Sequence, residues 1–188
     1  LRMAMGSPHE AAALMEAAER RYHNGSPHQH AWFKLQRGLI ALHSGDFERA
    51  CALYKSALQE LDGWWLAEEH LAEVQLLLGE RDKAQELYDV VIDKTGYPEF
   101  LDARAKMYES GGDLTNAKAM IDLARERFEA NIALLPEAVI GHAIPFYLSH
   151  GPAQYSLALA RPEYANRSDG DTAILLAHAQ MLNSAAEA

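Results

Sequence analysis

A glycine followed five residues later by a small residue recurs along the chain, and this step constrains the fold more than any other feature. The pairs are Gly6 and Ala11, Gly45 and Ala50, Gly79 and Ala84, Gly112 and Ala117, and Gly151 and Ser156, with a weaker copy at Asn183 and Ala188. Successive copies begin 39, 34, 33, 39 and 32 residues apart. Such a period is typical of arrays in which one supersecondary unit is stacked on the next.

Further positions keep the same register relative to the turn glycine. Seven residues before it lie Gly38, Ala72 and Ala105; nine after it lie Met15, Tyr54, Tyr88, Ile121 and Ala160; twelve after it lie Ala18, Ala57, Val91 and Ala124. Small residues on one helix face let a second helix approach closely, and the larger residue between them fills the crossing. Each copy therefore predicts a helix, a glycine turn and a second helix, with almost no strand in the chain.

This pattern resembles the tetratricopeptide repeat, a helix–turn–helix of about 34 residues. The stretch 31–64 matches it best, with Gly38, Gly45, Ala50, Tyr54 and Ala57 at the signature positions. The resemblance implies an all-α fold, a right-handed α-solenoid of helix–turn–helix repeats. We expect residues 1–188 to form a single array, with a partial repeat at 1–30, repeats at 31–64, 65–97, 98–136 and 137–168, and a partial repeat at 169–188.

The repeat at 137–168 departs most from the pattern. Ile144 stands where other repeats have a small residue, and we expect Pro145 and Pro162 to kink or break their helices. We also expect both ends of the chain to fall inside a repeat. From this we hypothesise that the chain is an excerpt of a longer array, or that its uncapped ends associate with another molecule or with a second copy.

Charge and composition exclude two classes of partner. The chain has 27 acidic and 17 basic side chains, a formal net charge of −10, and no dense run of Lys or Arg. Because phosphate binding depends on clustered positive charge, we expect no nucleic-acid partner. No apolar stretch reaches the roughly 18 to 20 residues of a membrane span. Cys51 is the single cysteine and leaves the redox compartment open, so a cytoplasmic and a periplasmic location both fit.

Residue clusters that would support chemistry are weak. The chain has no glycine-framed serine, no cysteine with a catalytic flanking signature and no phosphate-binding loop, so we expect no enzyme and no catalytic residue. Among nine histidines, His28 with His30 and His70 with Glu73 are the closest to ligand spacing. A zinc site usually needs three or four ligands in one place, and no second cluster accompanies these pairs. We therefore expect no metal and no cofactor.

The resemblance also implies a binding surface, because the first helices of such arrays line a concave groove that commonly receives a peptide or a helix of another protein. It places twelve residues there: Trp32, Leu35, Gln36, Leu39, His43, Leu66, Glu69, His70, Glu73, Glu99, Asp102 and Lys106. This groove would run from apolar to acidic, so we expect a protein or peptide partner with apolar and basic side chains. Members that clamp a terminal carboxylate carry Lys, Asn and Arg at such positions, and the side chains of this chain disfavour that ligand.

Three functions remain open from the sequence. The first hypothesis is a non-catalytic scaffold for protein–protein interaction, which binds a partner segment in this groove. The alternative is an architectural spacer or docking segment of a larger assembly, such as a bacterial envelope or export apparatus, which packs through its ends. An enzyme with a repeat-built cleft is retained as a third class for the sake of the histidines.

Overall fold

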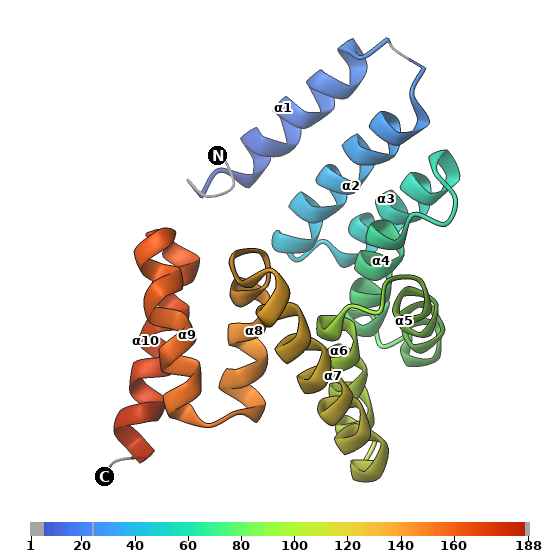
Figure 1. Ribbon diagram of the computed structural model, residues 1–188. Helices are drawn as coiled ribbons and strands as arrows, with labels where there is room; N and C mark the ends of the chain where they lie inside the picture. The colour runs from blue at the N-terminus through green and yellow to red at the C-terminus, as the bar shows by residue number, and fades with distance from the viewer. Residues whose placement is uncertain (1–5, 24, 187–188) are drawn as a thin grey trace. The chain divides into compact units, whose positions relative to one another are not determined.

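The computed structural model describes residues 6–23 and 25–186, and these residues form helices and no strand (Figure 1). The all-α fold class is thereby confirmed. The helices are α1 (Pro8–Arg21), α2 (Pro27–His43), α3 (Phe47–Glu60), α4 (Trp65–Leu77), α5 (Arg81–Thr95), α6 (Pro98–Ser110), α7 (Leu114–Leu134), α8 (Pro136–His150), α9 (Ala153–Asn166) and α10 (Gly170–Ala186).

The chain divides into two compact units, an N-terminal unit at residues 1–96 and a C-terminal unit at residues 97–188. In the N-terminal unit α2 packs on α3, α3 on α4, and α4 on α5, with α1 against α2. In the C-terminal unit α6 packs on α7, α7 on α8, α8 on α9, and α9 on α10. Each helix thus packs chiefly on its neighbours in the chain, as expected of stacked helix pairs. The division of residues 1–188 into a single array of repeats stays a prediction.

Three turns between paired helices have the same geometry. Gly45 has a φ of 77°, its N–H donates to the carbonyl of Leu42 at 3.0 Å, and the N–H of Asp46 donates to the carbonyl of Ala41 at 2.9 Å. This pairing satisfies carbonyls at the end of α2 and needs a left-handed residue, for which glycine has no steric penalty. The turns at Gly79 and Gly112 repeat both bonds at 2.9–3.1 Å. The glycine step in the sequence therefore marks helix ends.

The turn after α8 differs. Gly151 is extended, with φ −111° and ψ 172°. The next residue is Pro152, whose ring disfavours helical conformations in the preceding residue and favours extended ones. This turn therefore joins α8 and α9 by a different path from the three earlier ones.

The small residues that recur in each repeat lie where its two helices cross. Of the small residues five positions after the turn glycine, Ala50, Ala84, Ala117 and Ser156 are fully buried, and Ala11 is half-buried. At the α2–α3 crossing the Tyr54 ring lies against Gly38 so closely that an added Cβ would be 2.3 Å from Cε1 of Tyr54. The core of the N-terminal unit grows from this contact and joins α2, α3 and α4.

The core of the C-terminal unit is more aromatic. Phe128 of α7 packs on Phe146 of α8 with ring centroids 5.0 Å apart, and Ile144 is fully buried at the position of the usual small residue. Neither Pro145 nor Pro162 ends its helix, so the expectation of a break is wrong. Each proline removes one backbone hydrogen bond, but buried residues near it hold the helix in place: Ile144 and Phe146 beside Pro145, and Ala160 and Glu163 near Pro162.

Candidate functional site

The predicted groove residues of α2 differ in their accessibility. Leu35 is only 1% exposed and belongs to the core, because it packs into the cluster around Tyr54. Trp32, Gln36 and Leu39 are half-buried. His43 is exposed at the end of α2, where its Nδ1 lies 2.7 Å from the carbonyl oxygen of Leu39. Four of the five predicted side chains on α2 are thus accessible, and Leu35 is not.

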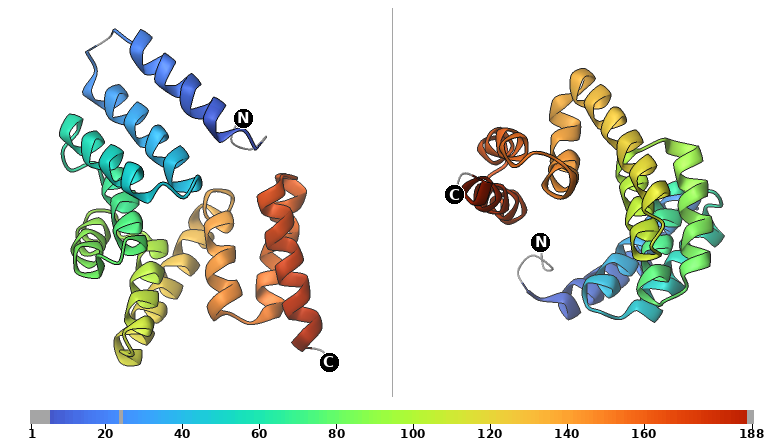
Figure 2. Two further views of the ribbon diagram at one scale, coloured as in Figure 1. Left: turned by 180° about the vertical axis from the view of Figure 1, so that it is seen from behind. Right: turned by 90° about the horizontal axis from the view of Figure 1, so that it is seen from below.

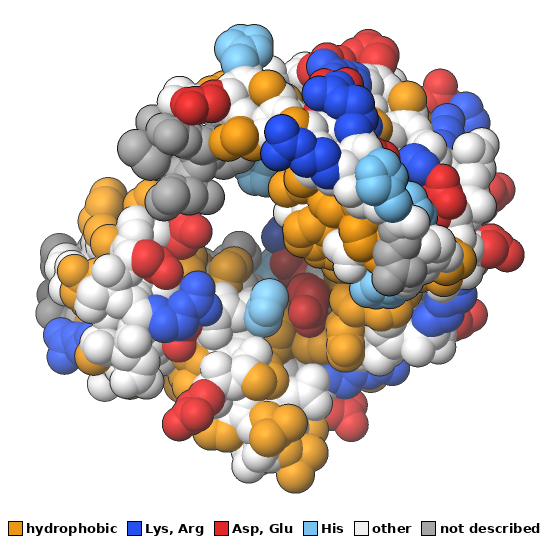
Figure 3. Space-filling model, turned by 90° about the horizontal axis from the view of Figure 1, so that it is seen from above, with side chains coloured by type: hydrophobic (Ala, Val, Ile, Leu, Met, Phe, Trp, Pro, Cys, Tyr) orange, Lys and Arg blue, Asp and Glu red, His pale blue; other side chains and the backbone are white. Residues whose placement is uncertain are grey.

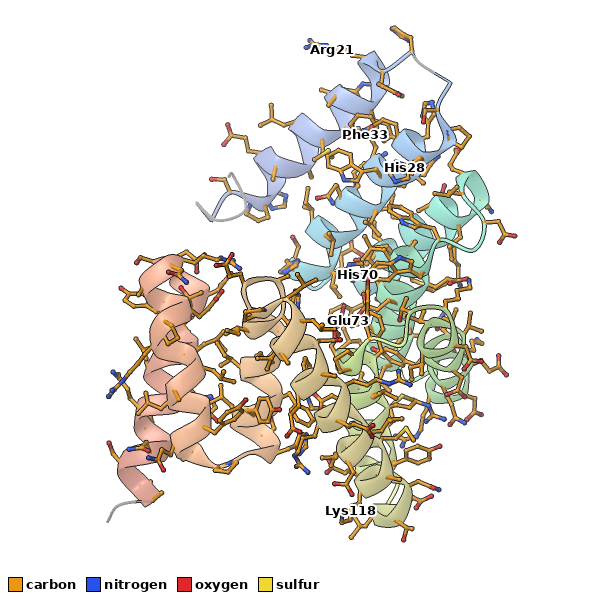
Figure 4. The ribbon with its side chains drawn as sticks, in the orientation of Figure 1. Arg21, His28, Phe33, His70, Glu73 and Lys118 are labelled. Carbon is orange, nitrogen blue, oxygen red and sulfur yellow. The ribbon has the colours of Figure 1, made fainter. Side chains whose placement is uncertain are left out.

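The predicted residues of α4 form a compact charged cluster. Nδ1 of His70 lies 3.1 Å from Oε2 of Glu69 and 3.5 Å from Oε2 of Glu73. All three side chains are half-buried, and Leu66 of the same helix packs against the core. Figure 4 shows His70 and Glu73 close together on α4. We call Glu69, His70 and Glu73 the α4 cluster.

Tyrosines of the neighbouring helices adjoin the α4 cluster. The Tyr54 ring of α3 stacks on His70, with centroids 5.5 Å apart and planes 21° apart. The Tyr54 hydroxyl and the Nδ1 of His70 are both buried without an aligned hydrogen-bond partner. Burial raises the pKa of Tyr54, and the charges of Glu73 and Glu69 raise it further. Burial and the same two carboxylates also raise the pKa of Tyr88 on α5. The cluster is therefore an acidic, partly dehydrated patch beside the buried hydroxyl of Tyr54.

The protonation of His70 is set by two opposing effects. Burial is the largest single influence and lowers the pKa of the imidazole, but Glu73 and Glu69 favour its charged form and together raise the pKa above the ordinary value. The folded state therefore holds this proton more tightly than the unfolded chain does.

A pH-dependent stability follows from that difference. The contribution of protonated His70 to the free energy of unfolding is fully present below the pKa that His70 has in the unfolded chain. It is lost as pH rises through the higher pKa that His70 has in the folded state. We expect the loss of unfolding free energy on His70→Gln to be larger at about pH 5.5 than at about pH 8.5, measured by urea unfolding. The difference between the losses that His70→Gln causes at the two pH values should shrink in a chain that already carries Glu69→Gln and Glu73→Gln. An equal loss at both pH values would contradict this account.

The α4 cluster is also the one group of three or more His, Cys, Asp or Glu donors with metal-binding proximity in residues 6–23 and 25–186. The three ligand atoms lie within 4.8 Å of one another. Imidazole and carboxylate suit a divalent transition metal, but a closed structural zinc site takes four ligands. The sequence paired His70 with Glu73; Glu69 joins them only because its side chain turns toward the imidazole.

The predicted residues of α6 lie in the C-terminal unit and make contacts within it. Asp102 is buried and accepts a hydrogen bond from Nζ of Lys106 at 2.7 Å, and its other oxygen lies 2.8 Å from Nε2 of His150. Glu99 is half-buried, 4.0 Å from Nδ1 of His142. Both histidine partners lie on α8, more than forty residues away in the chain, so no local spacing in the sequence indicates them.

Other residues of interest lie apart from these groups. Cys51 is buried and accepts a 3.6 Å hydrogen bond from Nε2 of Gln75, which fits a structural thiol.

On the face drawn in Figure 3, acidic side chains lie among the basic ones. Within the part of the chain that the structure describes, every helix is too short or too polar to cross a membrane.

Comparison with known proteins identifies solved structures that share this fold. No protein-family model and no curated protein matches the sequence. Solved structures do match: the tetratricopeptide-repeat protein TTC0263 of Thermus thermophilus is 17% identical with a TM-score of 0.63, over 96% of this chain and 94% of that one. MamA of Desulfovibrio magneticus is 16% identical with a TM-score of 0.59, over 100% of this chain and 92% of that one.

A tetratricopeptide-repeat protein from Parabacteroides merdae is 17% identical with a TM-score of 0.57, over 97% of this chain and 83% of that one. Identities this low show a shared fold. The resemblance read from the glycine register is thereby confirmed at the level of fold.

Proposed function

We propose that this chain, which has the tetratricopeptide-repeat fold, is a non-catalytic scaffold that binds a partner protein through the first helices of its repeats. The binding face of the N-terminal unit would be formed by α2 and α4. Its partner would be a segment with apolar and basic side chains.

The observation that carries this proposal is the α4 cluster. Two carboxylates converge on a single imidazole beside a buried hydroxyl without a partner. A basic side chain placed there would find two acceptors in a partly dehydrated site, where an ion pair is stronger than on an open surface. Burying charge is unfavourable unless it is compensated, so a basic side chain of a partner would add to the compensation that His70 gives the two carboxylates.

Apolar contacts would come from the same two helices. Trp32 and Leu39 on α2 and Leu66 on α4 are half-buried, so each offers part of an apolar side chain to a partner. Tryptophan is over-represented among residues that dominate binding energy. Gln36 and His43 would add polar contacts.

The residues of α6 enter the proposal separately. Glu99 and Lys106 are accessible to a partner. Asp102 already accepts from Lys106 and lies beside His150, so its role would be to hold α6 against α8.

The test is a selection of random displayed peptides on the full chain. We expect the selected peptides to be enriched in Arg or Lys together with Leu, Phe or Trp. Selected peptides without basic residues, or no selection above an unrelated helical protein, would overturn the proposal. Assembly through the ends, the spacer alternative, would give concentration-dependent self-association and no selected peptide.

Charge reversal on α4 is a sharper measure of the same face. Glu69→Lys with Glu73→Lys should weaken the binding of a selected basic peptide about tenfold or more, because the reversed charges repel the peptide. It should also reduce the salt dependence of the affinity. Binding is measured by fluorescence anisotropy. Glu86→Lys with Glu126→Lys, at exposed positions of α5 and α7, changes the net charge equally and should leave the affinity within about twofold.

Glu69→Gln with Glu73→Gln removes the charges without repulsion and guards against misfolding of the reversed variant. An affinity unchanged in both α4 variants would remove α4 from the binding face.

A further inference from the structure

A pocket of about 210 Å³ lies among α8, α9 and α10 of the C-terminal unit. Each of these three helices packs on the other two, and the helices lie side by side in Figure 2. The volume is well above the 10–15 Å³ that holds one water molecule and below the range of drug-sized ligand sites. It suits an object the size of one amino-acid side chain.

Two departures from the repeat register create this pocket. Ten residues before the turn glycine, three repeats carry a side chain, and the fourth has none: Leu35, Glu69, Asp102 and Gly141. Twelve residues after the turn glycine, three repeats have a small or medium apolar residue and the fourth a long acidic one: Ala57, Val91, Ala124 and Glu163. A Cβ on Gly141 would lie 3.2 Å from Oε1 of Glu163. The missing side chain on α8 therefore leaves room for a carboxylate on α9.

Size compensation alone does not explain why that residue is charged. Glu163 is only 6% exposed, and burying a carboxylate is unfavourable unless a cation compensates it. Its internal partner is Arg167, whose Nη1 lies 3.5 Å from Oε1, at the outer limit of a hydrogen bond. The Arg167 side chain is 63% exposed and also reaches Asp169 at 3.5 Å. The buried carboxylate is thus weakly compensated from within the chain.

The remaining walls of the pocket favour a cation as well. Glu137 from α8 and Asp171 from α10 add two more carboxylates, against the single guanidinium of Arg167. His142 lines the α8 side. Ala138 and Leu175 supply apolar surface on which an aliphatic stem can lie. A long side chain with a cationic head matches both kinds of surface.

We propose that this pocket binds a basic side chain, lysine or arginine, of a partner protein, with the cationic head at Glu163. The proposal shares with the proposed function the idea of a protein partner, but it concerns helices of the C-terminal unit and does not depend on the α4 cluster.

The test uses Nα-acetyl-lysine amide and Nα-acetyl-arginine amide as probes of the full chain, with Nα-acetyl-norleucine amide as the neutral control. We expect saturable backbone amide shifts at Gly141 and Thr172 in ¹H–¹⁵N spectra with one or both basic probes. The stronger of the two identifies the side chain. The neutral analogue should give no saturable shift. Absence of saturable shifts with both basic probes, or equal shifts with norleucine, overturns the proposal without reference to any variant.

Variants locate the site. Glu163→Gln keeps the shape of the side chain and should weaken the binding of the basic probe about tenfold or more. Gly141→Ala narrows the pocket and should weaken it too. Glu126→Gln, exposed on α7, should have no effect. If wild-type shifts persist unchanged in Glu163→Gln, the cation binds elsewhere and the proposal fails. Probe binding here with no peptide selected by the full chain would contradict the proposed function and leave this pocket standing.

Discussion

Phe128→Ala is expected to lower the unfolding free energy of the chain by about 3–5 kcal/mol. Phe128 is 1% exposed and packs on Phe146 and on Tyr147, with ring centroids 5.0 and 6.3 Å away. Removing its ring leaves a cavity between α7 and α8 where the surrounding helices can relax only in part. A loss of this size is a large share of the roughly 5–15 kcal/mol that stabilises a typical domain.

The measurement is urea unfolding followed by circular dichroism. Leu134→Ala is the matched control, because Leu134 lies at the end of the same helix and is 77% exposed. Its effect should stay within about 0.5 kcal/mol. A Phe128→Ala loss below about 1 kcal/mol would mean that α7 and α8 do not share the core seen here.

Gly38→Ala is the second large effect, and its sign is opposite to the usual one. Alanine is better than glycine inside a helix by about 1 kcal/mol. At this position, however, the new Cβ would lie 2.3, 2.7 and 3.0 Å from three atoms of the Tyr54 ring. That ring is fully buried and cannot move away freely. We expect a net destabilisation of about 1–3 kcal/mol from overpacking.

The control for Gly38→Ala is Gly170→Ala at the start of α10, where no atom lies within 4 Å of the added Cβ. It should be neutral or slightly stabilising. A smaller side chain opposite, Tyr54→Leu, should recover part of the stability lost in Gly38→Ala, which a double-mutant cycle measures. A stabilising Gly38→Ala would show that the α2–α3 crossing is looser than the register implies.

The fold was predictable because its signals are local. A left-handed glycine that ends one helix, and a small residue one turn into the next, are both visible within a dozen residues. Where the local signals compete, prediction fails. Pro145 and Pro162 favour a break, yet their helices continue because buried neighbours stabilise them. Gly151 looks like the other turn glycines but is followed by a proline, which selects an extended backbone.

The candidate site was less accessible to sequence reasoning. Spacing along one helix predicts that His70 and Glu73 meet, and they do. Leu35 holds the same register position as Glu69 but is part of the core, since burial at that position depends on the side chain it carries. The contact between Asp102 and His150 joins residues 48 positions apart, which no local pattern reveals.

The pocket of the C-terminal unit could be predicted from the sequence only in part. Gly141 and Glu163 are visible in the sequence as departures from the repeat, but each by itself is a single irregular residue. Only the packing of α8 on α9 shows that one departure makes space for the other. Paired departures in register are therefore a signal for such pockets in other repeat chains.

Photo-crosslinking of a selected basic peptide to the full chain, followed by mass spectrometry, shows whether α2 and α4 form the binding face. We expect the crosslinks to fall on α2 and α4, at or beside Trp32, Leu39, Leu66 and Glu73, and we expect Glu69→Lys with Glu73→Lys to abolish them. Crosslinks confined to α3 and α5, or unaffected by that double substitution, would contradict this binding face.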